Sequence, residues 1–417
     1  MQFVLHHLKK LSSHSVARNA GALGVMQIAN YAVPLLLLPF LTRQLGAEAF
    51  GVVAITLASI QLAFVLTDYG FSLSATHSIS INRENKQFVN EKIAAIFGAK
   101  VFLVIVASVL LVVIPASISE FREYLEFFVV AIIATVAQAF QPIWLFQGIE
   151  QMKNITLFTV LTKVVYAVLV LSLVSGPQDA IIVIYCWGAA QALGLIAALR
   201  LVYVAGYKVS IPDIEATVRE FKEGAQFFWS RLAVSVYTSA SILVVGSASA
   251  VQAAQYAVCE QVYRAGQNVT SPINTALYPY MAKNKDWKTF FRIVAVVGSI
   301  ITLGSAFLSF YSEILLAFIF GEEYRAAAPV LMVFLCTTVI NYFAIAFGYS
   351  AYSALGRIDV ANKTVILGAV FHLTVLFNAY FLFQISAIAV AVVVLSTETV
   401  VTILRVVIFF RIKNRDR

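Results

Sequence analysis

Charged residues are scarce in this chain: Asp, Glu, Lys and Arg make up 12% of its 417 residues, against about 25% in a typical soluble domain. Hydrophobic residues make up 61%, and the mean hydropathy is +0.87. A core alone cannot absorb so many apolar side chains, because a soluble chain of this length still needs a polar surface. The scarcity of charge therefore excludes a soluble protein and predicts an all-α integral membrane protein.

Cysteines and catalytic groupings are equally scarce. The three cysteines, Cys186, Cys259 and Cys336, lie far apart in apolar runs and lack metal-ligand spacing. We therefore expect small buried side chains there, with no metal and no cofactor. The sequence also shows no paired carboxylates, metal cluster or nucleophile–base set. We expect no catalytic residues and predict that the chain is not an enzyme.

Long apolar runs are what the sequence does contain. A helix needs about 20 mostly apolar residues to cross a bilayer, and twelve stretches qualify. They are residues 20–42, 50–78, 93–114, 124–147, 155–175, 180–204, 224–248, 254–281, 290–312, 328–353, 364–383 and 386–410. A polar stretch divides them six and six, so we predict an N-terminal six-helix lobe (1–205), a cytoplasmic linker (206–223) and a C-terminal six-helix lobe (224–417).

The basic residues alternate between the two sides of these spans. The even-numbered connections and both tails hold 21 Lys and Arg, whereas the odd-numbered connections hold three, Arg43, Arg122 and Arg325. Under the positive-inside rule this bias places both termini in the cytoplasm. The net charge of +8 then follows from topology, and we expect no nucleic acid partner.

Eight charged residues fall well inside the predicted spans, five or more positions from either end. The cations are Lys100, Lys163, Arg231, Arg264 and Arg405, and the anions are Asp68, Glu260 and Glu398. A charge at the bilayer centre costs about 2.5–3.5 kcal/mol on insertion scales. These side chains should therefore face protein or a water-filled cavity.

Helical spacing favours a cavity. In the eighth span six polar residues fall on one face at 100° per residue, namely Glu260, Arg264, Gln267, Ser271, Asn274 and Tyr278. The seventh span aligns Arg231 with Ser235, and the second aligns Gln61 with Asp68. We therefore predict a central polar cavity between the two lobes.

Simpler interpretations of single residues stay open. Lys100 and Lys163 can snorkel to the cytoplasmic boundary, and Arg405 can anchor the last span in the same way. Asp68 can cap or pair locally, and Glu260 and Arg264 can neutralise each other, since Glu before Arg at i,i+4 is the favourable order. His372 is more typical of a hydrogen-bonded buried histidine than of a proton relay.

Several segments together resemble the polysaccharide branch of the multidrug/oligosaccharidyl-lipid/polysaccharide flippase superfamily, the bacterial O-antigen (Wzx-type) translocases. They are "LGAEAFGVVAITLASIQLAFVLTDYGFSLSATHSIS" (45–80), "QPIWLFQGIEQMKNIT" (141–156), "AAQYAVCEQVYRAGQNVTSPINTALYP" (253–279) and "FGEEYRAAAPVL" (320–331). The resemblance covers essentially the whole chain. It implies a two-lobed transporter of twelve helices in the bacterial inner membrane.

The resemblance also implies a substrate, a short oligosaccharide on a polyprenyl diphosphate carrier, flipped from the cytoplasmic to the periplasmic leaflet by alternating access. Besides membrane lipids, it implies a coupling ion, a proton or sodium. From depth and alignment we assign Arg231 and Arg264 to the diphosphate or an acidic sugar. We take Glu260, Asp68 and Glu398 as candidates for ion coupling. Gln61, Lys100, Lys163, Ser235 and Gln267 complete the predicted cavity lining.

Other functions remain as alternatives. A multidrug exporter of the same fold would favour an anionic cavity for cationic drugs, whereas the intramembrane charges here are net positive. An exporter of another lipid-linked precursor has the same chemistry. A membrane polymerase or glycosyltransferase fits less well, because the longest predicted outer connection, 311–328, is half apolar.

Overall fold

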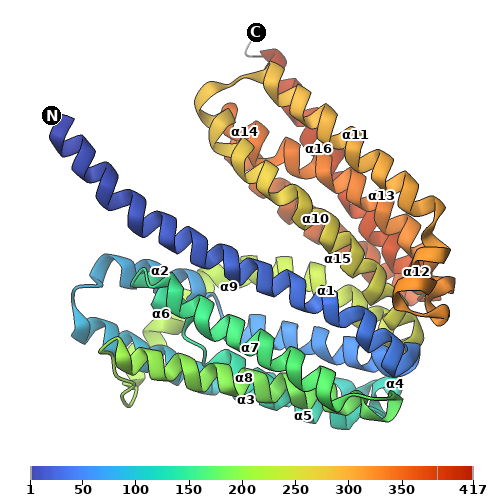
Figure 1. Cartoon of the computed structure of the whole chain (residues 1–417), viewed down its shortest axis with the longest axis horizontal. Helices are drawn as coiled ribbons and strands as arrows, with labels where there is room; N and C mark the ends of the chain where they lie inside the picture. The colour runs from blue at the N-terminus through green and yellow to red at the C-terminus, as the bar shows by residue number, and fades with distance from the viewer. Residues whose placement is uncertain (1, 383, 416–417) are drawn as a thin grey trace. The chain divides into compact units, whose positions relative to one another are not determined.

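The computed structural model describes residues 2–382 and 384–415. Within these ranges, the side chains are described at all positions except 2–18, 20, 230, 231, 233–238 and 415. Within this part every regular element is helical (Figure 1). The order is α1 (Gln2–Asp68), α2 (Phe71–Asn82), α3 (Lys86–Ser117), α4 (Ser119–Arg122), α5 (Leu125–Ala139), α6 (Ile143–Gly148), α7 (Met152–Leu173), η1 (Pro177–Asp179), α8 (Ala180–Val204), α9 (Ile214–Gly246), α10 (Ala250–Asn284), α11 (Trp287–Phe310), α12 (Ser312–Phe320), η2 (Glu322–Ala327), α13 (Ala328–Ile345), η3 (Ala346–Ser350), α14 (Ala351–Ala354), α15 (Ile358–Leu382) and α16 (Ala387–Arg415).

Among the described residues, nine helical segments are long and apolar enough to cross a membrane. The first, Gly21–Asn82, contains both of the first two predicted spans. α10 has the length to cross a bilayer but is not one of the nine. Its polar residues, described below, set it apart from the apolar helices.

The chain divides into two compact units. The first comprises Met1–Leu37 and Thr56–Leu232, and the second comprises Leu38–Ile55 and Ala233–Arg417. The central part of α1 thus belongs to the second unit. Gly51 explains this packing, because a Cβ there would lie 1.9 Å from the carbonyl oxygen of Ala250 at the start of α10. Only glycine permits the two backbones to approach so closely.

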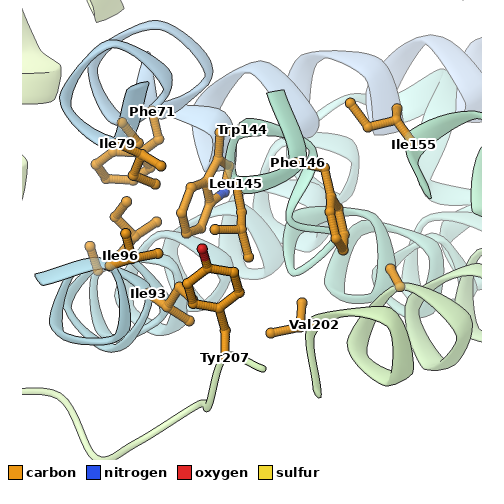
Figure 2. Packing of buried hydrophobic residues seen from close by; sticks show 14 of the residues in the cluster. Phe71, Ile79, Ile93, Ile96, Trp144, Leu145, Phe146, Ile155, Val202 and Tyr207 are labelled. Carbon is orange, nitrogen blue, oxygen red and sulfur yellow. The ribbon is translucent and has the colours of Figure 1, made fainter. Parts of the chain in front are cut away.

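The core of the first unit gathers around α6, the short helix in the resembling segment 141–156. Trp144, Leu145 and Phe146 are buried together with residues of α2, α3, α7, α8 and the chain after α8 (Figure 2). Labelled partners in Figure 2 are Phe71, Ile79, Ile93, Ile96, Ile155, Val202 and Tyr207. Gln141 and Pro142 separate α5 from α6, so the predicted span 124–147 is interrupted in the structure.

A second interruption falls inside the predicted span 50–78. α1 ends at Asp68, and α2 begins after Gly70, whose φ is +84°. A Cβ on Gly70 would lie 2.8 Å from Cβ of Phe227 and 2.9 Å from the carbonyl oxygen of Gly224. The close approach of α9 therefore requires glycine at this point as much as the positive φ does.

In the second unit α13 packs against α10, α11 and α16 (Figure 1). Its core contains the aromatic side chains of Phe290, Tyr342, Phe347, Tyr352 and Phe409. The predicted span 328–353 is broken by the π-helical turn η3, in which Gly348 leaves helical geometry (φ −89°, ψ −121°). This break lies beside the larger cavity described below.

The connections between helices contact one another in two sets. In the second unit, two odd-numbered connections meet, because the amide of Ala47 donates to Glu323 Oε2 (2.7 Å) and Arg43 Nε donates to the carbonyl of Ile319 (3.1 Å). Arg43 also donates to the carbonyl of Phe318. The resembling segments 45–80 and 320–331 thus touch each other.

The even-numbered connections meet as well. In the first unit, Arg83 pairs with Glu150 (2.9 Å), and the buried Lys92 bridges Glu220 (2.7 Å) and Glu223 (2.8 Å). Burial raises the pKa of the Glu220 carboxyl, against the opposing attraction of the Lys92 ammonium. Residues near the two ends of the chain also contact even-numbered connections.

Asn19 donates to the carbonyl of Glu150 (3.4 Å), next to the connection that precedes α7. Near the other end of the chain, the Lys413 ammonium lies 4.7 Å from the ring centre of Trp287, just after an even-numbered connection. Residues near both ends of the chain thus lie beside even-numbered connections, each within its own unit.

Candidate functional site

α10 brings the largest set of predicted site residues together. The helix begins after Ser249, whose hydroxyl oxygen accepts from the amide of Gln252 (3.4 Å) and caps the first turn. Gly266 lets α13 approach closely, since a Cβ there would lie 2.8 Å from Cγ2 of Thr338. The polar face of α10 borders two cavities within the second unit, and Gln267 lines both of them.

The smaller cavity, here called the carboxylate cavity, has a volume of about 130 Å³. Its lining consists of Ser241, Tyr256, Glu260, Tyr263, Arg264, Gln267, Phe334, Val394 and Glu398. Arg264 Nη2 donates to Glu260 Oε1 (3.0 Å), and the Arg264 side chain is 46% exposed. Two carboxylates and one guanidinium thus face a space suited to a small cation or a few water molecules.

A chain of side-chain hydrogen bonds connects α10 with α13 and α16. Gln267 Nε2 donates to the Tyr263 hydroxyl (2.8 Å) and to Asn341 Oδ1 (3.0 Å). Asn341 Nδ2 in turn donates to Glu398 Oε2 (2.9 Å). We call Gln267, Asn341 and Glu398 the amide relay, because it joins a carboxylate to a residue that both cavities share.

His372 of α15 is a buried, hydrogen-bonded histidine, as the sequence favours. One ring nitrogen lies 3.2 Å from the hydroxyl of Ser241 and the other lies 3.2 Å from the hydroxyl of Thr397. Ser241 lines the carboxylate cavity. His372 therefore hydrogen-bonds a lining residue of this cavity without being one of the lining residues itself.

The larger cavity, here called the amide cavity, has a volume of about 530 Å³. Its lining consists of Gln267, Asn268, Ser271, Asn274, Thr275, Tyr278, Ile345, Tyr349 and Ser350. None of these nine residues carries a charge, so within the described part of the second unit the polar face of α10 has a charged half and an uncharged half. The volume falls in the range of small-molecule sites, about 300–1,000 Å³.

The described site residues predicted in the first unit are not among the lining residues of these two cavities. Lys100 is 2% exposed, and its ammonium donates to the carbonyl of Ala139 (2.5 Å) at the end of α5. Asp68, which is 3% exposed, attracts Lys100 and accepts from the Ser72 hydroxyl across the break at Gly70. Lys100 therefore does not snorkel and instead supplies a donor where α5 ends.

The remaining predicted residues divide as follows. The Lys163 ammonium lies 4.6 Å from the ring centre of Trp187, a cation–π contact within the first unit. Gln61 is exposed on α1. The side chains of Arg231 and Ser235 lie outside the described residues. Their predicted roles therefore stay predictions.

The interpretation of Arg405 as an interfacial anchor is wrong. Its side chain is 6% exposed and donates to Thr364 Oγ1 (2.9 Å), the carbonyl of Ala344 (2.6 Å) and the carbonyl of Ala361 (3.4 Å). Arg405 thus binds the backbone beside the break in α13. Its guanidinium is hydrogen-bonded to protein groups, whereas that of a snorkelling arginine would be hydrated at the membrane surface.

Periodicity on α10 missed part of the site that comes from other helices. Asn341 of the amide relay and Tyr349 of the amide cavity lie in the predicted tenth span, which contains no charged residue. A signal was present, since Thr337, Thr338 and Asn341 form a polar patch in an otherwise apolar run. An amide inside a membrane helix requires partners, as a charge does.

No group of three or more His, Cys, Asp or Glu in the described part of the chain is arranged to hold a metal ion. The carboxylate cavity has oxygen ligands for a cation, and the amide cavity has neutral donors and acceptors for a polar, uncharged molecule.

Comparisons with known proteins identify one family model and a relative that covers most of the chain. The family model described as "Polysaccharide biosynthesis protein" matches residues 16–285. A relative named "Putative O-antigen transporter" from Escherichia coli (strain K12) is 27% identical over 93% of this chain and 95% of its own length.

Two solved structures share the fold. The first is the lipid II flippase MurJ in an inward closed conformation, with a TM-score of 0.70, 11% identity, and 93% of this chain and 89% of that chain covered. The second is an inward-facing multidrug resistance MATE family transporter of the MOP superfamily, with a TM-score of 0.68, 14% identity, and 93% and 95% covered. At such identities the likeness concerns the fold alone.

Proposed function

The chain belongs to the polysaccharide biosynthesis protein family, and on this premise we propose that it flips a polyprenyl-diphosphate-linked oligosaccharide, similar to an O-antigen repeat unit, from the cytoplasmic to the periplasmic leaflet by alternating access. The nine apolar helices found in the described part of the chain and a relative named as an O-antigen transporter make it a multi-pass protein of the bacterial inner membrane. It acts as a transporter and not as an enzyme, since the relative is a named transporter.

One observation carries the proposal: the polar face of α10 borders two cavities with different chemistry. A diphosphate and a glycan cannot cross about 30 Å of hydrocarbon without polar partners. A purely structural ion pair between Glu260 and Arg264 would need no hydrogen-bonding surface further along the helix. The polar face continues through Ser271 and Asn274 to Tyr278, which supports a path for a polar ligand.

The proposed topology has twelve membrane-spanning helices in two six-helix lobes, 1–205 and 224–417, with a cytoplasmic linker at 206–223 and both termini in the cytoplasm. The contacts between connections support it. Odd-numbered connections meet odd-numbered ones at Ala47 and Glu323, and even-numbered ones meet at Lys92 and Glu220. Such pairing is expected when successive spans alternate in direction.

We assign the carrier diphosphate to Arg264 and Arg231. A guanidinium presents a planar fork of donors that suits phosphate oxygens. Arg264 is half-exposed while it pairs with Glu260, so it can exchange one anionic partner for another. Glu260 gains a proton when the diphosphate takes Arg264, and this exchange links substrate binding to an ion gradient.

Glu398 is the second proposed ion-coupling carboxylate, and Asp68 is the candidate in the first unit. Protonation of Glu398 at Oε2 places an O–H donor opposite the Nδ2 donor of Asn341, which favours a rotation of the Asn341 amide so that Oδ1 accepts. Asn341 then presents Nδ2 to Gln267, which must rotate in turn to present Oε1. Because Gln267 lines both cavities, the amide relay transmits the protonation of Glu398 to the amide cavity.

The multidrug alternative fits the cavities less well. The carboxylate cavity, at about 130 Å³, is smaller than the usual range for drug-sized ligands. The amide cavity has the volume, but its described lining offers no carboxylate to bind a cationic drug. Exporters of other lipid-linked precursors would need the same chemistry, and their substrates differ from the proposed one only in the sugar.

A transport experiment tests the proposal. Cells without the protein should accumulate lipid-linked repeat units that face the cytoplasm. The wild-type protein should restore flipping, whereas Arg264→Ala and Arg231→Ala should each lose most of it. Arg325→Ala is the matched control, because Arg325 also pairs with a glutamate, Glu322 (3.0 Å), but at an exposed outer connection away from both cavities.

Full rescue by Arg264→Ala would contradict the proposed site. Ion coupling has a test of its own, which is flipping in proteoliposomes with and without a proton or sodium gradient. Glu260→Gln should make the rate insensitive to the gradient. If the Glu260→Gln protein responded to the gradient as the wild type does, Glu260 would not be the coupling residue.

A further inference from the structure

The amide cavity contains an unusual acceptor. The side chain of Asn274 is 8% exposed, and its Nδ2 donates to the carbonyl of Thr270 (3.3 Å), four residues earlier in α10. This bond fixes the orientation of the amide, because the reverse orientation would oppose two oxygens. Oδ1 of Asn274 is left buried with no hydrogen-bond partner in the protein.

A buried acceptor without a partner is rare in folded proteins and calls for a specific explanation. Asn274 is one of the lining residues of the amide cavity, and its Oδ1 is covered in this state, so a ligand that enters the cavity and shifts the side chains over Oδ1 can supply the donor that the protein does not. Hydroxyl and acetamido N–H groups are such donors. Ionised carboxylates and phosphates accept hydrogen bonds only, and they would oppose Oδ1 with another acceptor.

The rest of the lining points to the same ligand. Among the described residues it contains no charged side chain that could compensate a buried anion. Tyr278 and Tyr349 are 39% and 46% exposed and contribute flat apolar rings together with hydroxyl groups. The Tyr349 hydroxyl donates to Asn362 Oδ1 (2.7 Å), which fixes this ring at the cavity. A neutral sugar offers both an apolar face and hydroxyl donors.

We propose that the amide cavity is a subsite for a neutral sugar and that Asn274 selects it by accepting a hydrogen bond from a sugar hydroxyl or acetamido N–H. The inference rests on the proposed function, since the sugar is the glycan of the lipid-linked substrate. It goes further, because it assigns different parts of the substrate to different halves of α10. The half at Glu260 and Arg264 handles charge, and the half at Asn274 requires a donor and rejects an acidic sugar.

Binding to the full-length protein in lipid nanodiscs tests this separation. Three probes are compared: polyprenyl diphosphate alone, the same carrier with a neutral trisaccharide, and the same carrier with one hexose replaced by a hexuronate. The wild type should bind the neutral glycolipid at least about tenfold more tightly than the acidic one. Asn274→Leu should lose about tenfold in affinity for the neutral glycolipid and keep its affinity for the bare carrier.

Asn378→Leu is the matched control. Asn378 also donates through Nδ2 to the carbonyl four residues earlier, Thr374 (2.7 Å), but it lies exposed on α15 outside the cavity lining. Its affinity for all three probes should equal that of the wild type. If Asn274→Leu fails to fold, Asn274→Ser replaces it, because the shorter hydroxyl does not reach the position of Oδ1, and the same selective loss is expected.

The possible failures are distinguishable. If the wild type binds the carrier but the neutral and acidic glycolipids bind equally, the subsite is wrong and the proposed function stands. Equal loss of carrier and glycolipid affinity in Asn274→Leu also overturns the subsite, because it indicates a general structural role. If the wild type binds none of the three probes, the proposed function falls and the subsite falls with it.

Discussion

The guanidinium of Arg405 lies where α13 breaks, and we predict that leucine at this position destabilises the second unit. Arg405 has two good hydrogen bonds, to Thr364 Oγ1 (2.9 Å) and to the carbonyl of Ala344 (2.6 Å), and a longer one to the carbonyl of Ala361 (3.4 Å). The helix ends at Ile345, just after Ala344. Broken membrane helices are tolerated only where other groups satisfy the freed backbone.

Two opposing effects set the magnitude for Arg405→Leu. Hydrogen bonds between membrane helices average about 0.6 kcal/mol and reach about 1.7 kcal/mol, so the two good bonds contribute roughly 1–3 kcal/mol. Removal of a buried charge acts in the other direction, because an apolar replacement of a buried ion can stabilise. We expect the loss to prevail by about 1–2 kcal/mol, since leucine leaves the Ala344 carbonyl without this donor.

The thermal unfolding midpoint of the purified full-length protein in nanodiscs measures this effect. At about 2–4 °C per kcal/mol for a unit of this size, Arg405→Leu should lower the midpoint by roughly 2–8 °C. Arg405→Lys retains the charge but not the planar fork, so its midpoint should lie between those of the leucine variant and the wild type. A leucine variant as stable as the wild type would refute the role of Arg405 at the break.

Two further predictions concern packing and pH. Gly51→Ala should lower the unfolding midpoint, because its Cβ would lie 1.9 Å from the backbone carbonyl oxygen of Ala250, whereas Gly304→Ala, with nothing within 4 Å, should not lower it. Burial raises the pKa of Glu220 despite the attraction of Lys92, so the folded state holds this proton more tightly than the unfolded chain, and stability falls as the pH rises from about 4.5 through the raised pKa. As the pH rises over this range, the unfolding midpoint of the wild type should therefore fall relative to that of Glu220→Gln. If the difference between the two midpoints stayed constant up to pH 7, the prediction would be contradicted.

Helical periodicity alone was enough to find one side of the candidate site. Glu260, Arg264 and Gln267 share a face because residues three and four apart lie on the same side of a helix, and the structure places all three at the carboxylate cavity. Ser271 and Asn274 continue the same face into the amide cavity. This part is local: it depends only on α10 being a helix, which the sequence makes clear.

The interruptions of the helices were not predictable in the same way. Tyr69 and Gly70 stand inside a long apolar run, and a single glycine there does not distinguish the end of a helix from its interior, because glycine is frequent within membrane helices. The need for glycine at position 70 comes from the backbone of Gly224, which is more than 150 residues away in the sequence. Arg405 was misread for the same reason, because the carbonyl groups that it satisfies belong to α13 and α15.

The opposite wall of the candidate site depends on which apolar helix faces α10, and periodicity cannot decide this, since α11, α13 and α15 all offer apolar faces. Close approach decides it instead. Gly266 admits Thr338 of α13 to within contact distance, and the next polar residue along that face, Asn341, then meets Gln267 at 3.0 Å. The pair consists of a glycine on one helix, Gly266, and an amide on the other, Asn341, which lies one turn beyond the residue that the glycine contacts. Neither residue attracts notice in the sequence by itself. The polar partners of a membrane helix are therefore best sought beside its glycines, where the backbone permits a second helix to come near.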